Sequence, residues 1–311
     1  MVNRFKSFIK TSALYKSLVM IGSKIILPGF GGISIYETAL HFKHGLNKGS
    51  LPTRAAALSY NFFLALFPSV IFLFTLIPYI PIDNFQWRLL EAIRMFMPAN
   101  AYEATEETIN EIITQPNGGL LSLGFLMALY FSTNGFNSMI NAFNNSYHDV
   151  EKRKPLMQRF ISLLMVVIST STIILGIGTL VAGEYLINHL GNEAGNTLKL
   201  FLLDMSKWLA LFMLCWILIS TMYYLSPARR SRGWRFFSPG SLMATLLSIA
   251  TSLGFAYFVN NFGTYNKVYG SLGTLIVVMI WIYLNAVVLL VGFEINASIH
   301  TAKRKKVLGL N

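Results

Sequence analysis

Hydrophobic residues along this chain gather in six long segments separated by short polar connections. The segments cover residues 55–82, 118–147, 160–183, 208–228, 236–262 and 270–298. Each holds 21 residues or more, and about 20 apolar residues are enough for a helix to cross the hydrocarbon core of a bilayer. The pattern predicts an all-α fold: a polytopic membrane protein built as a six-transmembrane-helix bundle, with residues 51–299 as its transmembrane domain.

Residues 1–50 follow a different pattern, basic and only moderately apolar. Leu14, Leu18, Ile21 and Ile25 recur at spacings of four, three and four, which places them on one helical face, while lysines punctuate the segment. Such a helix is expected to lie on the bilayer surface with its lysines toward anionic headgroups. A second short helix is expected over about residues 33–46. The sequence thus predicts N-terminal amphipathic surface helices, and residues 300–311 as a basic cytoplasmic tail.

Composition and charge agree with this class. Of 311 residues, 54% are hydrophobic and 12% are charged, whereas soluble domains carry about a quarter charged residues. The net charge is +12, and 20 of the 25 lysines and arginines fall on the side of the membrane that holds both termini. The positive-inside rule places that side in the cytoplasm. This asymmetry accounts for the charge without a nucleic-acid partner, and it offers anionic lipid headgroups a basic surface.

The last apolar segment carries one amide, Asn285, in its middle and one acid, Glu294, near its basic end. A polar joint rich in glycine precedes it. Because glycine permits backbone changes that other residues resist, this joint is a predicted outer hinge. Lys267 is expected to attract an anionic headgroup there. The hinge residues are Tyr265, Lys267, Tyr269, Gly270 and Gly273.

A column of four amides runs along the second segment. Asn134, Asn137, Asn141 and Asn144 are spaced three, four and three, so they share one helical face. Amides that face lipid would leave polar groups unpaired in hydrocarbon. The column therefore faces either other helices, which it would hold by hydrogen bonds, or water, in which case it lines a polar cavity. We expect it to face the sixth segment, near Asn285 and above Glu294.

Two columns of small residues have the same kind of spacing. In the third segment Ser162, Ser169, Gly176 and Gly183 lie seven apart, which predicts close helix packing. The fifth segment carries Ser241, Thr245, Ser248 and Ser252 on one face, for which packing and cavity lining both remain open.

An ion pair between the first and last segments is a further hypothesis. Arg54 begins the first segment at the depth where Glu294 ends the last. Pairing them would join the two helices at the inner mouth, whereas Glu294 alone could be an interfacial acid that reaches water. Together with Asn285 and the four amides, this pair makes up the candidate substrate-binding cavity.

Three ordered motifs carry a resemblance to a known family. The first is Arg54-Ala-Ala-Ala-Leu-Ser-Tyr60 running to Ala65-Leu-Phe-Pro68, and the second is Trp234-Arg235 with Ser238-Pro239-Gly240. The third is Tyr265-Asn266 with Tyr269-Gly270-Ser271-Leu272-Gly273, followed by Gly292-Phe293-Glu294-Ile295-Asn296-Ala297. These motifs resemble the YihY/BrkB family of bacterial inner-membrane proteins, long labelled ribonuclease BN. The resemblance implies a multi-pass protein of the bacterial inner (plasma) membrane.

Catalytic chemistry finds little support in this sequence. RNA hydrolysis needs a metal cluster or a positioned acid–base pair. Histidines are scattered over both predicted membrane faces, and neither a Walker loop nor a Gly-x-Ser-x-Gly elbow occurs. The single cysteine, Cys215, excludes a disulfide within one chain. We expect no enzymatic activity, no cofactor and no metal site. The five histidines are His41, His44, His148, His189 and His300.

The predicted function is transport or flipping of a lipid or an anionic amphiphile through a polar intramembrane cavity. The alternative is a membrane scaffold or envelope-integrity protein without transport, and a membrane-bound ribonuclease ranks third. The expected partners are membrane lipids with anionic headgroups at the cytoplasmic face. The sequence does not set the oligomeric state, and a homo-oligomer stays open.

Overall fold

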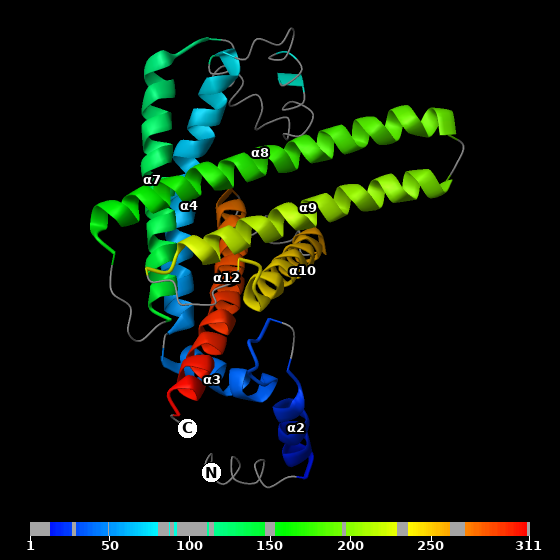
Figure 1. Cartoon of the computed structure of the whole chain (residues 1–311). Helices are drawn as coiled ribbons and strands as arrows, with labels where there is room; N and C mark the ends of the chain where they lie inside the picture. The colour runs from blue at the N-terminus through cyan, green and yellow to red at the C-terminus, as the bar shows by residue number, and fades with distance from the viewer. Residues whose placement is uncertain are drawn as a thin grey trace.

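The computed structural model describes residues 13–26, 29–48, 50–79, 87, 90–91, 111, 115–146, 153–194, 197–228, 236–261 and 271–309. Every regular element in these residues is a helix, and six helices are long and apolar enough to cross a membrane (Figure 1). The predicted all-α polytopic fold is therefore confirmed.

The six membrane-length helices match the predicted segments in order. They are α4 (Leu51–Leu76), α7 (Gly118–Asn144), α8 (Pro155–Ala194), α9 (Thr197–Leu225), α10 (Pro239–Asn261) and α12 (Ser271–Val307), and a short 3-10 turn, η1 (Ile77–Tyr79), extends α4. Three helix ends lie well beyond the apolar segments: α8 continues to Ala194, α9 begins at Thr197 and α12 continues to Val307. The residues that flank the apolar segments also favour helix. At the end of α12, the basic residues fill the last turn, where cations complement the helix dipole. The predicted boundary near residue 299 is therefore not a break in the helix.

Two shorter helices, α2 (Ala13–Lys24) and α3 (Ile35–Lys48), precede the first membrane-length helix. They confirm the predicted N-terminal helices. A capping box starts α3: the backbone N–H of Glu37 donates to Oγ of Ser34, and the N–H of Ser34 donates to the Glu37 carboxylate, both at 3.2 Å. Figure 1 shows α3 against the C-terminal half of α12.

An antiparallel pair, α4 and α7, forms one side of the molecule (Figure 1). Two glycines of α7 set the distance between the two helices. A Cβ on Gly124 would lie 3.2 Å from the backbone nitrogen of Phe72, and one on Gly135 would lie 3.2 Å from the ring of Phe62. Only small residues allow two helix backbones to approach so closely. The pair is thus fixed by its glycines.

The α8–α9 hairpin runs across α4 and α7 and extends away from them in Figure 1. Ser162 and Ser169 are buried near its base. Further out, Gly176 approaches Leu211 and Gly183 approaches Lys207 of α9. The predicted packing role of this column of small residues is therefore confirmed. Along the outer part of α8, by contrast, Ile174 and Val181 are 63% and 65% exposed.

Candidate functional site at the Arg54–Glu294 pair

Three helices meet at Arg54, which lies in the first turn of α4. Its Nη1 donates to the carbonyl oxygen of Ala142 at 2.9 Å and to the hydroxyl of Ser146 at 3.0 Å, at the end of α7. Its Nη2 lies 3.5 Å from Oε2 of Glu294 on α12. The guanidinium is buried, since Arg54 is only 8% exposed. The predicted Arg54–Glu294 pair is confirmed.

This ion pair is loosely made. Charge-assisted N–H···O bonds to carboxylates usually span about 2.7–2.9 Å, and 3.5 Å is clearly longer. Among the described residues, Nε of Arg54 has no hydrogen-bond partner. Nε and Nη2 form one edge of the guanidinium, the kind of edge that engages a carboxylate or phosphate through two parallel bonds. Glu294 therefore engages only one of the two donors on that edge, Nη2, and at a long distance.

Helix α3 covers the carboxylate of Glu294. The glutamate is 2% exposed, and a Cβ built on Gly45 would overlap its Oε1 atom. The backbone of α3 therefore rests directly on the carboxylate, and a side chain at position 45 would force the two apart. Gly45 was missed by the sequence reasoning. The available signal was a glycine inside a helical pattern, which often marks close packing.

A tight crossing of α10 and α12 lies beside Glu294. A Cβ on Gly292 would come 2.6 Å from the Cβ of Ala244, and a Cβ on Gly240 of α10 would overlap the carbonyl oxygen of Gly292. The side-chain amide of Asn296 bridges the crossing, accepting from the Gly240 N–H at 2.9 Å and donating to Oγ of Ser238 at 2.7 Å. Residues of all three sequence motifs thus converge around one pair.

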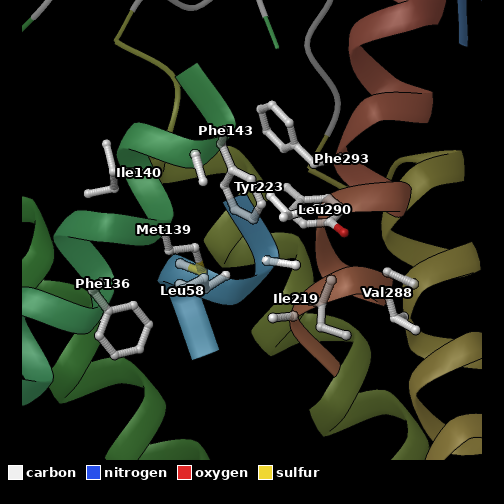
Figure 2. Close-up of a cluster of buried hydrophobic side chains, with 14 of the residues drawn as sticks. Leu58, Phe136, Met139, Ile140, Phe143, Ile219, Tyr223, Val288, Leu290 and Phe293 are labelled. Atoms are coloured by element: carbon white, nitrogen blue, oxygen red, sulfur yellow. The ribbon is translucent and has the colours of Figure 1, made fainter. Parts of the chain in front are cut away.

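Aromatic rings hold the neighbouring turn of α12 in place (Figure 2). Phe143 of α7 stacks on Phe293 with ring centroids 4.2 Å apart, and Tyr223 of α9 meets both rings edge to face. The Tyr223 hydroxyl also donates to the carbonyl oxygen of Leu289 at 2.6 Å. Since Phe293 directly precedes Glu294, this cluster fixes the position of the carboxylate.

The amide column faces a different helix from the one expected. Gln158, in the first turn of α8, donates to Oδ1 of Asn137 at 2.6 Å and to Oδ1 of Asn141 at 2.9 Å. Arg159 donates to Asn134. The prediction that the column faces the sixth helix is wrong, because these polar side chains at the base of α8 supply the donors that the amide oxygens need.

The remaining predicted site residues do not join the pair. Oδ1 of Asn144 accepts from the backbone N–H of Ala228, after the end of α9. Asn285 donates to the carbonyl oxygen of Trp281 within its own helix, while the amide column is bonded to Gln158, Arg159 and Ala228. Of the predicted hinge, Gly273 lies buried near the start of α12. Tyr265, Lys267, Tyr269 and Gly270 lie outside the described residues.

Arg153, which precedes α8, was also missed as a structural residue. Its guanidinium donates to the carbonyl oxygens of Leu225, at 2.9 Å, and of Ser226 and Pro227 at the end of α9. Carbonyl groups at a helix C-terminus lack intrahelical partners, and a cation there also complements the helix dipole. In the sequence Arg153 is one of the 20 lysines and arginines on the side of the termini, and its spacing alone does not indicate this contact.

One titrating group lies on the same face of α3 as Gly45. Burial lowers the pKa of His41, and the nearby positive charge of Lys305 and the neighbouring His44 lower it further, while Glu37 opposes them. Neutral His41 therefore suits the contact between α3 and the basic end of α12. Within the described part of the chain, no three His, Cys, Asp or Glu side chains come close enough together to hold a metal ion.

Six membrane-length helices around a buried ion pair define a polytopic α-helical integral membrane protein. Residues 42–309 match the family model described as Virulence factor BrkB, so this chain belongs to that family. The match confirms the resemblance seen in the sequence motifs.

Relatives from several bacteria align over most of the chain. The ribonuclease-like protein YfkH of Bacillus subtilis (strain 168) is 33% identical over 273 residues, which is 86% of this chain and 95% of that protein. The UPF0761 membrane protein of Aggregatibacter aphrophilus (strain NJ8700) is 21% identical over 272 residues, covering 86% and 94% of the two chains. No solved structure matches.

Proposed function

We propose that this protein moves a lipid or an anionic amphiphile across the membrane, and that the Arg54–Glu294 pair holds the anionic group. One observation carries the proposal: a buried guanidinium between spanning helices with half of one hydrogen-bonding edge unused. Charged side chains inside membrane-spanning segments are expensive, and they commonly mark substrate pathways. A pair kept only for stability would be expected to use its donors fully.

The proposed location is the bacterial inner membrane, with both termini in the cytoplasm. The support is the excess of lysine and arginine on the side of the termini. In this orientation α3 and the basic end of α12 face the anionic cytoplasmic leaflet. Reporter fusions after Lys199 and at the C-terminus should then report opposite sides of the membrane. Fusions that report the same side would contradict this topology.

Transport is tested with purified protein in liposomes that carry a headgroup-labelled phosphatidylglycerol, by following the fraction of label that a membrane-impermeant reductant can reach. Wild-type protein should expose the inner-leaflet label, and Arg54→Gln should slow this step at least tenfold. Arg159→Gln is the matched control, because it removes an exposed arginine from the same bundle. Wild-type liposomes that behave like protein-free ones would contradict the proposal and favour a scaffold role.

A ribonuclease is the second candidate, favoured by the name of the 33% identical relative. Purified protein freed of contaminating nucleases is incubated with a tRNA precursor and Mg²⁺, Mn²⁺ or Zn²⁺. We expect no cleavage. Activity that persists through chromatography and disappears on replacing His41, His44 or His148 would favour the ribonuclease over the transporter.

A further inference from the structure

We infer that the Nε–Nη2 edge of Arg54 is a binding site for a phosphate group, which Glu294 occupies weakly and α3 covers in this conformation. This inference rests on the proposed function for the role of the site, and it adds the chemical class of the ligand and the element that controls access. Bound phosphate would displace the Glu294 carboxylate from the guanidinium, without a covalent step.

The orientation of Arg54 supports a fixed anion site. Nη1 is held by the Ala142 carbonyl and the Ser146 hydroxyl, so the guanidinium cannot turn freely. Its opposite edge is aimed at Glu294, with Nη2 3.5 Å from the carboxylate and Nε unpaired within the described part of the chain. A planar two-donor edge matches two oxygens of a phosphate, which carries more charge than a carboxylate. Phosphate would therefore complete contacts that Glu294 leaves unmade.

Access to this edge is controlled by α3. The helix lies on the carboxylate through Gly45, and Nζ of Lys306 on α12 donates to the carbonyl oxygen of Gly32, just before α3, at 3.3 Å. Ser50, between α3 and α4, has φ +38°, a left-handed conformation that is strained for a residue other than glycine. That strained joint stands four residues before Arg54. We infer that α3 is a lid that pivots at Ser50.

Phosphate binding is measured by thermal unfolding of the full chain in detergent with increasing inorganic phosphate at constant ionic strength. Glu294→Gln removes the competing charge and should bind phosphate at least tenfold more tightly than wild type, whereas Arg54→Gln should lose the stabilisation. Gly45→Ala displaces α3 and should also tighten binding. Gly254→Ala is its control, because a Cβ there meets nothing within 4 Å.

A second measurement separates lipid phosphate from free phosphate. Protein in nanodiscs that contain phosphatidylglycerol, or only an uncharged glycolipid, is released into the gas phase, and the retained lipid is weighed by native mass spectrometry. Retention of phosphatidylglycerol by wild type but not by Arg54→Gln assigns the site to a lipid headgroup. Stabilisation by inorganic phosphate without lipid retention assigns it to free phosphate.

The inference is overturned if Arg54→Gln and wild type respond alike to inorganic phosphate and to phosphatidylglycerol. It is also overturned, for the lid, if Gly45→Ala and Gly254→Ala bind phosphate equally. Should Glu294→Gln fail to fold, the comparison of the two glycine variants remains. Lipid transport without Arg54-dependent phosphate binding would contradict this inference but leave the proposed function standing. Phosphate binding at Arg54 without transport would contradict the proposed function but leave the phosphate site standing.

Discussion

The α4–α7–α12 region and the α8–α9 hairpin are both strongly apolar, yet they bury their residues to different extents. In α7, 28% of the most apolar stretch is buried, against 17% in α8, although α8 is the more hydrophobic helix. In water the more hydrophobic helix would be expected at the core. In lipid, apolar side chains gain little by leaving hydrocarbon, so packing and polar contacts decide which helices associate.

Polar and small residues account for the difference. Arg54, at the start of α4, links three helices, and further along the α4–α7 pair Gly135 and Gly124 allow the backbones to approach. Along the outer half of the hairpin, Gly178 has an open environment in which a Cβ would meet nothing within 4 Å. The Arg54 region is thus a core held by specific contacts, whereas outer α8 packs one face on α9 and leaves another face exposed. Four experiments test this difference between the two regions.

The largest effect is expected at the ion pair. Arg54→Ala leaves Glu294 buried without its partner and should lower the free energy of unfolding by about 3–5 kcal/mol. Arg159→Ala, at the exposed base of α8, should cost about 1 kcal/mol or less. Chemical denaturation in detergent measures both. Equal losses would show that the two regions are not energetically distinct.

The second-largest change in stability is expected where two helices cross closely. Gly292→Ala places a Cβ 2.6 Å from that of Ala244 and should destabilise the protein by about 1–3 kcal/mol. Gly178→Ala in α8 meets open space and should be neutral or stabilise by up to about 1 kcal/mol, through the higher helix propensity of alanine. Thermal unfolding of the two variants side by side is the measurement. A destabilised Gly178→Ala would place an unrecognised contact on the outer hairpin.

The amide column joins the two regions and should have a smaller effect. Asn137→Leu removes the hydrogen bond from Gln158, and interhelical bonds of this kind contribute about 1 kcal/mol. A double-mutant cycle with Gln158→Leu should give a coupling energy of that size, with membrane insertion unchanged. If either single variant abolishes transport while stability hardly changes, the column has a role beyond holding α7 to α8.

The smallest effect is a pH dependence of the α3 contact. Burial and Lys305 lower the pKa of His41 below its ordinary value of about 6.5, with His44 adding to the effect and Glu37 opposing it. Undocked His41 binds a proton more readily, so docking gains stability as pH rises through the window that ends near pH 6.5. The protection factors of the amide hydrogens in α3, which divide out the intrinsic pH dependence of exchange, should therefore fall as pH falls below about 6.5. His41→Gln should remove this dependence, and an unchanged profile in that variant would exclude His41 as its source.

The class of protein and the number of its spanning helices follow from the sequence alone. Hydrophobic length predicts a spanning helix because unsatisfied backbone groups are too costly in hydrocarbon for other structures, so six apolar segments meant six helices. The column Ser162–Ser169–Gly176–Gly183 was also predictable, since small residues at heptad spacing favour close packing. The Arg54–Glu294 pair could also be proposed, because two opposite charges at the same depth of a membrane cost less free energy when they are paired.

Which helix faces meet, by contrast, is known only from the folded structure. Four amides on one face need partners, but their spacing does not say whether Asn285 on α12 or Gln158 on α8 supplies them. In the structure the partner is Gln158 on α8. Likewise, nothing local marks Gly45 as the residue that lies on Glu294, because that contact joins residues far apart in the chain. Periodicity fixes a side chain's direction relative to its own helix axis. The neighbour in that direction depends on how the helices cross.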